Sequence, residues 1–525
     1  AHYLEGSAKA TDLILVPDTD WSLPFEYAGD TVIEMPRLDD PDGGWSHLES
    51  LSENTQRLFV VDYLSETRDW QSQLTFALKK AGTQVANTRY EGLEVRTYEL
   101  KEPIAAPRIT PMLVNYEPLV LNGIWIEQDE GAGDAVAVAL SWQLSKPIDD
   151  GANVTLRLLD EEGWLIASTD TLLRDRYGRP SDQWKVGEII TTYHVIEVPR
   201  AIPPLSYELR VQVYLDDDER IHSLDILDEK GAPSGQASAI GTVNIVYKPP
   251  KINDHENLPI VPQSEPLMTA SGLTLLAAEV GGGVYAPGDD LRIQLLWQAG
   301  ERSLADLQPE VVLVQESGDL SVSSGAPAYG HYPTNLWSVG EMVHEHRKLN
   351  IPATASGEFQ IVLRLGESEV VLDEIEVISE QHNYEIVPVA YEIDANFGDI
   401  ARLTGFNILK EQFSSGESVP LELVWQSSTN GSADDYVVFA HILAEDGRLI
   451  GQHDSPPANG ARRVTGWLID EYVVDHHEMI LNENYYGQAS LEVGIYDPLT
   501  GNRVLLPDGS DHLILPVTIN FTPAE

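Results

Sequence analysis

A pair of tryptophans occurs three times along this chain at nearly constant spacing. The first member of each pair ends an apolar run and precedes a glutamine; these residues are Trp142, Trp297 and Trp425. The second member follows 42, 40 and 42 residues later, at Trp184, Trp337 and Trp467. A glycine lies 21, 21 and 22 residues after the first tryptophan, at Gly163, Gly318 and Gly447. Markers that recur in register predict three copies of one folding unit.

The segments around these markers read as short antiparallel strands. They alternate apolar and polar residues, as half-buried strands do, and turns rich in glycine, proline and aspartate separate them. Each copy holds roughly seven to nine such segments, enough for two packed sheets of the immunoglobulin or jelly-roll kind. We therefore expect antiparallel β-sandwich domains at residues 104–247, 267–379 and 380–525, with a proline-rich linker at 248–266.

The first 103 residues follow a different pattern. Apolar runs at 12–16, 31–35, 57–64 and 93–100 alternate with helical stretches at 45–55 and 70–82. This alternation predicts a small α/β domain at residues 1–103, Rossmann-like, with a largely parallel sheet. The turn after the first run, residues 17–22, has no glycine that would let a phosphate approach the backbone, so no nucleotide site is expected. The predicted fold class is multidomain and mainly β.

Charge and composition exclude several kinds of partner and site. The net charge is −51, so the surface repels nucleic acid and anionic lipid. Such a surface suits an exposed protein, a salty habitat or calcium-holding loops. There is no cysteine, hence no disulfide, thiol nucleophile or zinc–thiolate site. No run of 18 apolar residues predicts a membrane helix.

The N-terminal residues show neither a signal peptide nor an initiator methionine. The first ten residues lack a basic start and an apolar stretch, and they read as the interior of a helix. We expect that the chain begins at a cut, made by maturation or by design.

The repeated residues are expected to build the fold. An indole can fill the space between two sheets if its N–H finds a partner; a sugar-stacking platform is the alternative. An acidic residue follows the turn after each second tryptophan, at Glu188, Glu341 and Glu471. A glycosidase needs one facing pair of carboxylates, so three equivalent copies favour a structural hydrogen bond to the turn backbone. The turn position itself holds Gly187, Gly340 and Asp470.

Histidines and acidic runs raise the question of a metal. The histidines are His194 in the first copy, His344 and His346 in the second, and His476 and His477 in the third. His344 and His346 would share one face of a strand, but no third ligand is evident, so satisfied or exposed histidines are expected. Acidic runs at 38–44, 214–220 and 286–290 offer oxygen ligands without matching the twelve-residue calcium loop. No metal, cofactor or catalytic residue is therefore predicted, and calcium stays an open possibility.

Three stretches of the chain resemble a known family. Residues 2–30, HYLEGSAKATDLILVPDTDWSLPFEYAGD, resemble the soluble region after the membrane helices of bacterial multi-spanning, polyprenyl-phosphate-sugar glycosyltransferases related to protein mannosyltransferases. Residues 446–457 and 494–504 resemble β-sandwich modules attached to such proteins; the second copy departs most from this pattern. The resemblance implies an extracytoplasmic, non-catalytic region. In that family, catalysis depends on acidic residues in loops beside membrane helices. Such helices are absent from this sequence, so the resemblance implies no catalytic residue here.

These observations leave three hypotheses. The first is a non-catalytic cell-surface or extracytoplasmic binding or scaffolding protein, a glycan-related accessory region of a membrane glycosyltransferase. Its expected partners are glycans or other surface proteins, with the membrane reached only through a missing N-terminal part. The second is a structural surface-layer or filament subunit stabilised by calcium. The third is a glycoside hydrolase with accessory sandwiches, which needs two carboxylates roughly 5–10 Å apart in one cleft.

Overall fold

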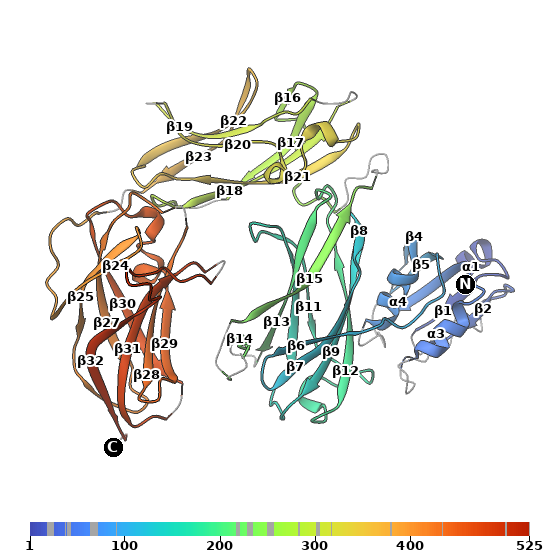
Figure 1. Ribbon diagram of the computed structural model, residues 1–525. Coiled ribbons are helices and arrows are strands. Elements are labelled where there is room, and N and C mark those ends of the chain that lie inside the picture. Colours follow the sequence, from blue (N-terminus) through green and yellow to red (C-terminus); the bar gives the residue numbers. More distant parts are fainter. Residues whose placement is uncertain are drawn as a thin grey trace. The chain divides into compact units, whose positions relative to one another are not determined.

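The chain is mainly β and divides into two compact units, Ala1–Pro259 and Ile260–Glu525 (Figure 1). The computed structural model describes residues 1–17, 26–36, 38, 44–63, 72–90, 92–216, 221–227, 231, 235–248, 257–281, 284–300, 305–316, 318–378, 381–432, 434–482, 484–498 and 501–523. In these ranges no helix combines the length and the apolar character needed to cross a membrane. The predicted mainly β, multidomain architecture is confirmed.

The first unit begins with a five-stranded sheet in the order β2-β1-β3-β5-β4. Its elements are α1 (His2–Ser7), β1 (Leu13–Leu15), β2 (Val32–Glu34), α3 (Trp45–Ser52), β3 (Arg57–Tyr63), α4 (Gln73–Ala81), β4 (Gly82–Tyr90) and β5 (Leu93–Leu100). β1 pairs in parallel with β2 and β3, whereas β5 pairs antiparallel with β3 and β4. The sheet is therefore mixed, and the expectation of a largely parallel sheet is wrong. The reason is β4, a polar and mostly exposed strand that turns straight back into β5 instead of crossing the sheet.

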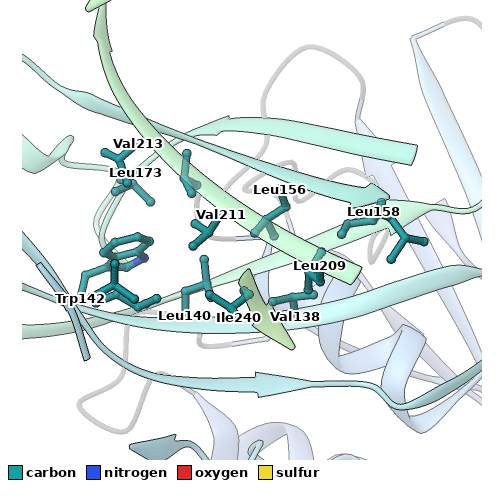
Figure 2. Packing of buried hydrophobic residues seen from close by; sticks show 14 of the residues in the cluster. Val138, Leu140, Trp142, Leu156, Leu158, Leu173, Leu209, Val211, Val213 and Ile240 are labelled. Atoms are coloured by element: carbon teal, nitrogen blue, oxygen red, sulfur yellow. The ribbon is translucent and has the colours of Figure 1, made fainter. Parts of the chain in front are cut away.

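Two facing sheets follow, which we call sheet pair 1. One sheet has the order β12-β9-β7-β6, and the other has the order β11-β10-β13-β15-β8, with β14 beside β13. The strands are β6 (Thr110–Asn115), β7 (Leu119–Ile126), β8 (Asp129–Gly131), β9 (Ala135–Leu144), β10 (Ala152–Leu159), β11 (Leu165–Leu172), β12 (Ile189–Glu197), β13 (Ser206–Asp216), β14 (Ile221–Ser223) and β15 (Ala237–Val246). Figure 2 shows side chains of both sheets meeting in one apolar cluster around Trp142, which includes Leu140, Leu156 and Val211.

Strand β9 is buried on both faces, although a half-buried strand was expected. Its inward residues pack between the two sheets, while Ala137 and Ala139 belong to a second cluster with Trp45, Phe76 and Tyr193. Helix α4 lies against β9 and β12, so the N-terminal elements cover the outer face of this sheet (Figure 1). Alternating alanines leave room for a helix at this face.

The second unit holds sheet pairs 2 and 3. Pair 2 has sheets β16-β17-β18-β21 and β20-β19-β22-β23. Its strands are β16 (Met268–Ala270), β17 (Leu273–Val280), β18 (Asp290–Ala299), β19 (Glu310–Gln315), β20 (Gly318–Ser324), β21 (Met342–Asn350), β22 (Gly357–Leu365) and β23 (Ser368–Val377).

In pair 3 the sheets β24-β25-β27-β30 and β29-β28-β31-β32-β26 are continuous, because β29 pairs with β30 at Gly451 and Gln452. The strands are β24 (Tyr391–Phe397), β25 (Ala401–Ile408), β26 (Gln412–Ser414), β27 (Val419–Ser427), β28 (Val437–Ala444), β29 (Leu449–Ser455), β30 (Tyr472–Leu481), β31 (Gly487–Tyr496) and β32 (Leu513–Thr522).

The three pairs share one strand order. The strand that carries the first tryptophan, β9, β18 or β27, lies between an earlier strand (β7, β17 or β25) and the strand that follows the second tryptophan (β12, β21 or β30). In the opposite sheet the orders β11-β10-β13-β15, β20-β19-β22-β23 and β29-β28-β31-β32 correspond one to one. Markers at equal spacing thus occupy equivalent places in three equivalent topologies.

Candidate functional site

The first tryptophan of each copy is fully buried between its two sheets. In pair 1 the Trp142 indole Nε1 donates to Thr192 Oγ1 at 3.1 Å, and in pair 2 the Trp297 Nε1 donates to Glu345 Oε2 at 2.7 Å. In pair 3 the Trp425 Nε1 has no hydrogen-bond partner among the described residues. The predicted core role of these indoles is confirmed by their burial.

The acceptors belong to a feature that the sequence analysis missed, a pair of polar residues on the strand beside the tryptophan. The residues in register with the first tryptophans are Ile190, Val343 and Val473. Two and four positions further along lie Thr192 with His194, Glu345 with Arg347, and Asp475 with His477. Alternate strand residues share a face, so each of these pairs points inward. We call them the inward polar pairs.

In sheet pair 1 the inward polar pair is neutral. His194 Nε2 lies 2.8 Å from Thr192 Oγ1, and His194 Nδ1 lies 3.0 Å from Thr171 Oγ1 on β11 of the opposite sheet. Burial lowers the pKa of His194 to about 4, so the ring is uncharged at neutral pH. This series of hydrogen bonds therefore connects the Trp142 indole to the facing sheet without a buried charge.

In sheet pair 2 the inward polar pair is an ion pair. Arg347 Nε donates to Glu345 Oε1 at 2.7 Å, and the two side chains are 5% and 1% exposed. The remaining guanidinium nitrogens donate to the carbonyls of Ser323 and Gly325, at the end of β20 in the facing sheet, at 3.2 and 2.8 Å. Two buried charges are tolerated here because each has several hydrogen bonds.

In sheet pair 3 the inward polar pair is an aspartate and a histidine. His477 Nε2 lies 2.9 Å from Asp475 Oδ2, and His477 Nδ1 lies 3.0 Å from His453 Nδ1 on β29. Asp475 Oδ1 accepts a hydrogen bond from Ala458 N at 2.7 Å. Asp475 is one methylene shorter than Glu345 and both its oxygens are bonded, so the Trp425 indole is left without it.

An aspartate that orients a histidine also occurs in nucleophilic hydrolases. The described hydrogen bonds of His453 go to His477 alone, and no hydroxyl bonds to it. A hydrolytic relay needs a nucleophile within hydrogen-bond reach of its base. This arrangement therefore connects two sheets and does not form a triad among the described residues.

The second tryptophans are held alike in all three copies. Each follows a 3₁₀ turn, at Ser181–Gln183, Thr334–Leu336 or Val464–Gly466, and its indole N–H donates to a carbonyl five residues earlier. The acceptors are Arg179 at 3.0 Å, Tyr332 at 3.0 Å and Arg462 at 2.7 Å. All three rings are buried, so none offers the exposed face that sugar stacking needs. The turn residues Gly187, Gly340 and Asp470 all have positive φ, at 83°, 76° and 67°.

The recurring acid has the expected structural role in two copies. Glu341 Oε2 accepts from the backbone N of Ser338 at 2.7 Å, and Glu471 Oε1 accepts from the backbone N of Leu468 at 2.9 Å. Burial raises the pKa of Glu341 although this bond opposes it. Glu188 is exposed, and no such bond is described for it, so its expected role is not met in the first copy.

Glu471 also anchors the segment that leads into sheet pair 3. His382 Nδ1 lies 2.6 Å from Glu471 Oε2, and Arg462 Nη2 lies 2.9 Å from the same oxygen. Arg462 Nη1 in turn donates to the carbonyl of Gln381 at 3.1 Å. The Glu471 side chain is fully buried, so these contacts fix the connecting segment to the turn of the second tryptophan.

The candidate metal ligands do not converge. His344 Nε2 lies 3.0 Å from Gln294 Oε1, and the rings of His344 and His346 are 4.6 Å apart. His476 is exposed beside Glu422. Within the described ranges no group of three or more histidine, aspartate or glutamate side chains is placed to hold a metal ion.

The acidic runs noted in the sequence either have structural roles or lie largely outside the described residues. In the run 286–290, Asp289 Oδ2 accepts from Ala286 N at 2.8 Å, and Asp290 pairs with Lys348 at 2.7 Å. Residues 39–43 and 217–220, which make up most of the other two runs, lie outside the described residues. The turn predicted not to bind a nucleotide, 17–22, also lies outside them beyond residue 17.

The run 286–290 belongs to a further repeat, which spacing alone could have revealed. A glycine lies nine residues before each first tryptophan, at Gly133, Gly288 and Gly416, with φ of 83°, 84° and 90°. An acid follows each glycine, at Asp134, Asp289 and Glu417. In two copies its carboxylate caps the turn by accepting from the backbone N three residues earlier. The acids are turn residues in these copies, which accounts for their recurrence without calcium.

A group of charged side chains lies on the other face of β28. The His441 ring contacts Glu492 at 3.1 Å and Asp454 at 3.4 Å, and Arg503 and His512 each lie 3.5 Å from Glu492. Burial would lower the pKa of His441, but the hydrogen bonds to the two carboxylates outweigh it and raise that pKa. Both ring nitrogens of His441 thus face carboxylates, and Arg503 and His512 connect the segment after β31 to the sheet through Glu492.

The carboxyl with the largest pKa change outside these pairs lies in the first unit. Burial and a hydrogen bond to Glu130 raise the pKa of Glu127 to about 7. Lys79 on α4 approaches both carboxyls, at 3.6 and 3.0 Å. Two glycosidase carboxyls stand roughly 5–10 Å apart with a sugar between them. Glu127 and Glu130 instead share Lys79 as an ion-pair partner.

Comparison with known proteins adds no assignment to this geometry. No protein-family model matches the chain, and no curated protein sequence matches it significantly. We therefore infer the function from the contacts within the chain.

Proposed function

We propose that this chain is a non-catalytic binding or scaffolding protein that acts outside the cytoplasm, as a glycan-related accessory region of a membrane glycosyltransferase. Its parts would be a small Rossmann-like α/β domain at 1–103 and three copies of one immunoglobulin- or jelly-roll-like module. The modules would span 104–247, 267–379 and 380–525, with 248–266 as a linker. The family resemblance of residues 2–30 supports the location.

One observation supports the non-catalytic role. The inward polar pairs place titratable side chains inside each copy, and these side chains are buried and bonded across the two sheets. A substrate site needs convergent polar groups that open into a concave pocket. Groups that bond to the facing sheet in all three copies serve the module itself, and they leave the outer surface for partners.

Affinity electrophoresis of the intact chain in gels cast with cell-surface polysaccharides tests this role. We expect retardation by at least one polysaccharide, with no release of reducing sugar on prolonged incubation. A variant of an inward residue, His453→Ala, serves as the matched control and should bind normally. Release of reducing sugar that this variant abolishes would refute the non-catalytic role, and mobility unchanged by every polysaccharide would remove the glycan part.

A contact inside the second unit favours a surface-layer or filament subunit as the second candidate. A side chain on Gly288, in the turn before β18, would meet the backbone of Thr465 and Gly466 in the next sheet pair. The equivalent Gly416 of sheet pair 3 meets no described atom within 4 Å. A turn that docks a following module in one copy and is open in another can join separate chains end to end.

Electron microscopy and sedimentation with and without a calcium chelator separate the two candidates. Ordered arrays or rods that dissolve in chelator support the filament subunit. A single species of monomer mass at every protein and calcium concentration supports the binding protein instead. Gly416→Arg places a bulky group in the open turn and should abolish assembly if that turn is the contact.

A further inference from the structure

Each sheet pair has two ends that differ in structure. The glycine turn that precedes the first tryptophan strand lies at one end, which we call the glycine end. The turn after the second tryptophan lies at the opposite end of the same strand, which we call the tryptophan end. There the turn residue donates its backbone N–H to the carbonyl of the last residue of that strand; these carbonyls belong to Leu144, Ala299 and Ser427.

Within the second unit, the glycine end of pair 2 docks on the tryptophan end of pair 3. A Cβ atom on Gly288 would lie 2.2 Å from the carbonyl carbon of Thr465, so the two turns are in backbone contact. Beside them, a Cβ atom on Gly431 would lie 3.4 Å from Cβ of Ala353. Gly288 and Gly466 are both buried. The chain thus contains one example of how a glycine end contacts a tryptophan end.

The glycine ends are covered in two copies and open in the third. In pair 1 the segment that follows the pair covers this end, because Lys248 contacts Asp134 and the carbonyl of Asn257 accepts from Arg200 N at 2.9 Å. In pair 2 the next module covers it. In pair 3 Gly416 is exposed, and a Cβ atom there would meet no described atom within 4 Å. The glycine end of pair 3 is therefore a docking surface that no described residue covers.

The tryptophan end of pair 1 is open in the same way. Gln183, which occupies the position of the buried Gly466, is exposed, and so are the neighbouring Val186 and Ile189. Val186 is 52% exposed, and Ile480, at the glycine end of pair 3, is 60% exposed. Contact between these two ends would remove apolar surface of both from water.

Charge favours the tryptophan end of pair 1 over that of pair 2 as the receiving surface. The glycine end of pair 3, residues 409–418 and 478–482, contains three acids and one cation. Residues 174–187 of pair 1 contain four cations and two acids, whereas residues 325–340 of pair 2 contain no lysine or arginine. The arginines of pair 1 are bonded within their own loop, so only the net charge of the loop matters here. Opposite net charges speed association and select the partner surface.

We propose that the glycine end of pair 3 docks on the tryptophan end of pair 1 of a second copy of this chain. The contact would repeat the junction between pairs 2 and 3. Because it joins two different surfaces, each copy keeps one open end of each kind, and the contact propagates into a filament or closes into a ring. This inference rests on the second candidate function above, the surface-layer or filament subunit.

Sedimentation velocity of the intact chain over a range of protein concentrations tests the interface. Ile480→Asp in the docking surface and Val186→Asp in the receiving surface should each weaken association about tenfold or more, since each places a charge in an apolar contact. A mixture of these two variants should recover dimers and nothing larger, because each variant keeps the surface that the other has lost. Leu113→Asp, at an exposed apolar site on β6, is the matched control and should associate like the unmodified chain. All three side chains are exposed, so the melting temperature should stay unchanged.

Engineered thiols identify the contacting turns, because the chain contains no cysteine of its own. Disulfides form between residues whose Cα atoms lie within about 7 Å. A mass-tagged Gln183→Cys chain mixed with a Ser415→Cys chain should form the mixed disulfide in excess over disulfides between like chains. Leu336→Cys, at the position in pair 2 equivalent to Gln183, is the control and should not.

Three results would overturn the proposal. Faster disulfide formation by Leu336→Cys would move the receiving surface to pair 2. Assembly that Ile480→Asp and Val186→Asp both leave unchanged would refute this interface while the filament candidate stands. A single species of monomer mass at every protein concentration, with calcium present or absent, would refute the interface and the filament candidate together.

Discussion

Replacing Glu127 with glutamine should make the first unit more stable at alkaline pH. The Glu127 carboxyl lies between α4 and sheet pair 1, where Oε2 accepts a hydrogen bond from the backbone N of Ala137 at 3.0 Å. Burial and the neighbouring Glu130 favour its protonated form and raise its pKa to about 7. Glutamine has the shape of that protonated form, keeps the acceptor for Ala137 and cannot acquire a charge.

The size of the effect follows from the pKa. A carboxyl whose pKa rises from 4.5 in the unfolded chain to about 7 in the folded chain keeps its proton to a higher pH in the folded state. Its contribution to the free energy of unfolding is complete below pH 4.5 and is lost as the pH rises through 7, in all about 3 kcal/mol. The pI of 4.4 sets a practical lower limit for the measurement. Between about pH 5.5 and 8.5 we expect about 2 kcal/mol, or about 4–8 °C in melting temperature for a unit of this size.

Differential scanning calorimetry of the intact chain from about pH 5.5 to 8.5 measures this difference. The transition of the first unit should fall with rising pH in the unmodified chain and fall less in Glu127→Gln. Glu99→Gln removes an exposed carboxylate from the same unit, on β5, and should follow the unmodified chain. Parallel pH profiles for Glu127→Gln and the unmodified chain would refute the buried, protonated carboxyl.

Further predictions concern the second unit, each measured against the unmodified chain. Trp297→Phe removes a hydrogen bond to Glu345 and should lower the free energy of unfolding by about 1–3 kcal/mol more than Trp425→Phe, whose indole N–H has no described partner; equal losses in chemical denaturation would contradict this. Arg347→Met leaves a buried carboxylate without its cation and should destabilise by about 3–5 kcal/mol in the same assay; a loss under about 1 kcal/mol would count against a buried pair. Glu471→Gln weakens the anchor of the segment before β24, so limited proteolysis should cleave that segment faster; an unchanged cleavage rate would show that the anchor is unimportant.

The repeat could be predicted because its markers are large and local. An indole fills so much of the space between two sheets that its position along the chain is constrained, and its spacing therefore survives where the intervening residues differ. The turn residue Asp470 follows the same logic, since aspartate is one of the few residues other than glycine that enters a positive-φ turn. These markers predict strands and turns within each copy.

Features that depend on distant segments could not be predicted. Strand β9 has alanines on the face that α4 covers, and that helix lies about 60 residues earlier in the chain. A single-sequence pattern shows that both faces are apolar without showing what lies against them. Strand β4 was missed because its residues are polar and exposed, and its place in the sheet comes from pairing with β5. The sequence does contain the inward polar pairs, but no shared residue type marks them.

The inward polar pairs differ in chemistry but agree in what they connect. A neutral Thr192–His194 pair, a Glu345–Arg347 ion pair and an Asp475–His477 pair have very different costs of burial, because a charge loses far more solvation than a hydroxyl. If desolvation alone decided which residues occupy these positions, apolar residues would cost less free energy to bury in every copy. Each pair instead ends on the strand at the equivalent place in the topology, at β11, β20 or β29. A directional bond between two sheets fixes their relative register, whereas apolar contacts alone allow the sheets to shift. The requirement common to the three copies is thus the connection itself, and any residues that complete it without an unbonded polar atom satisfy it.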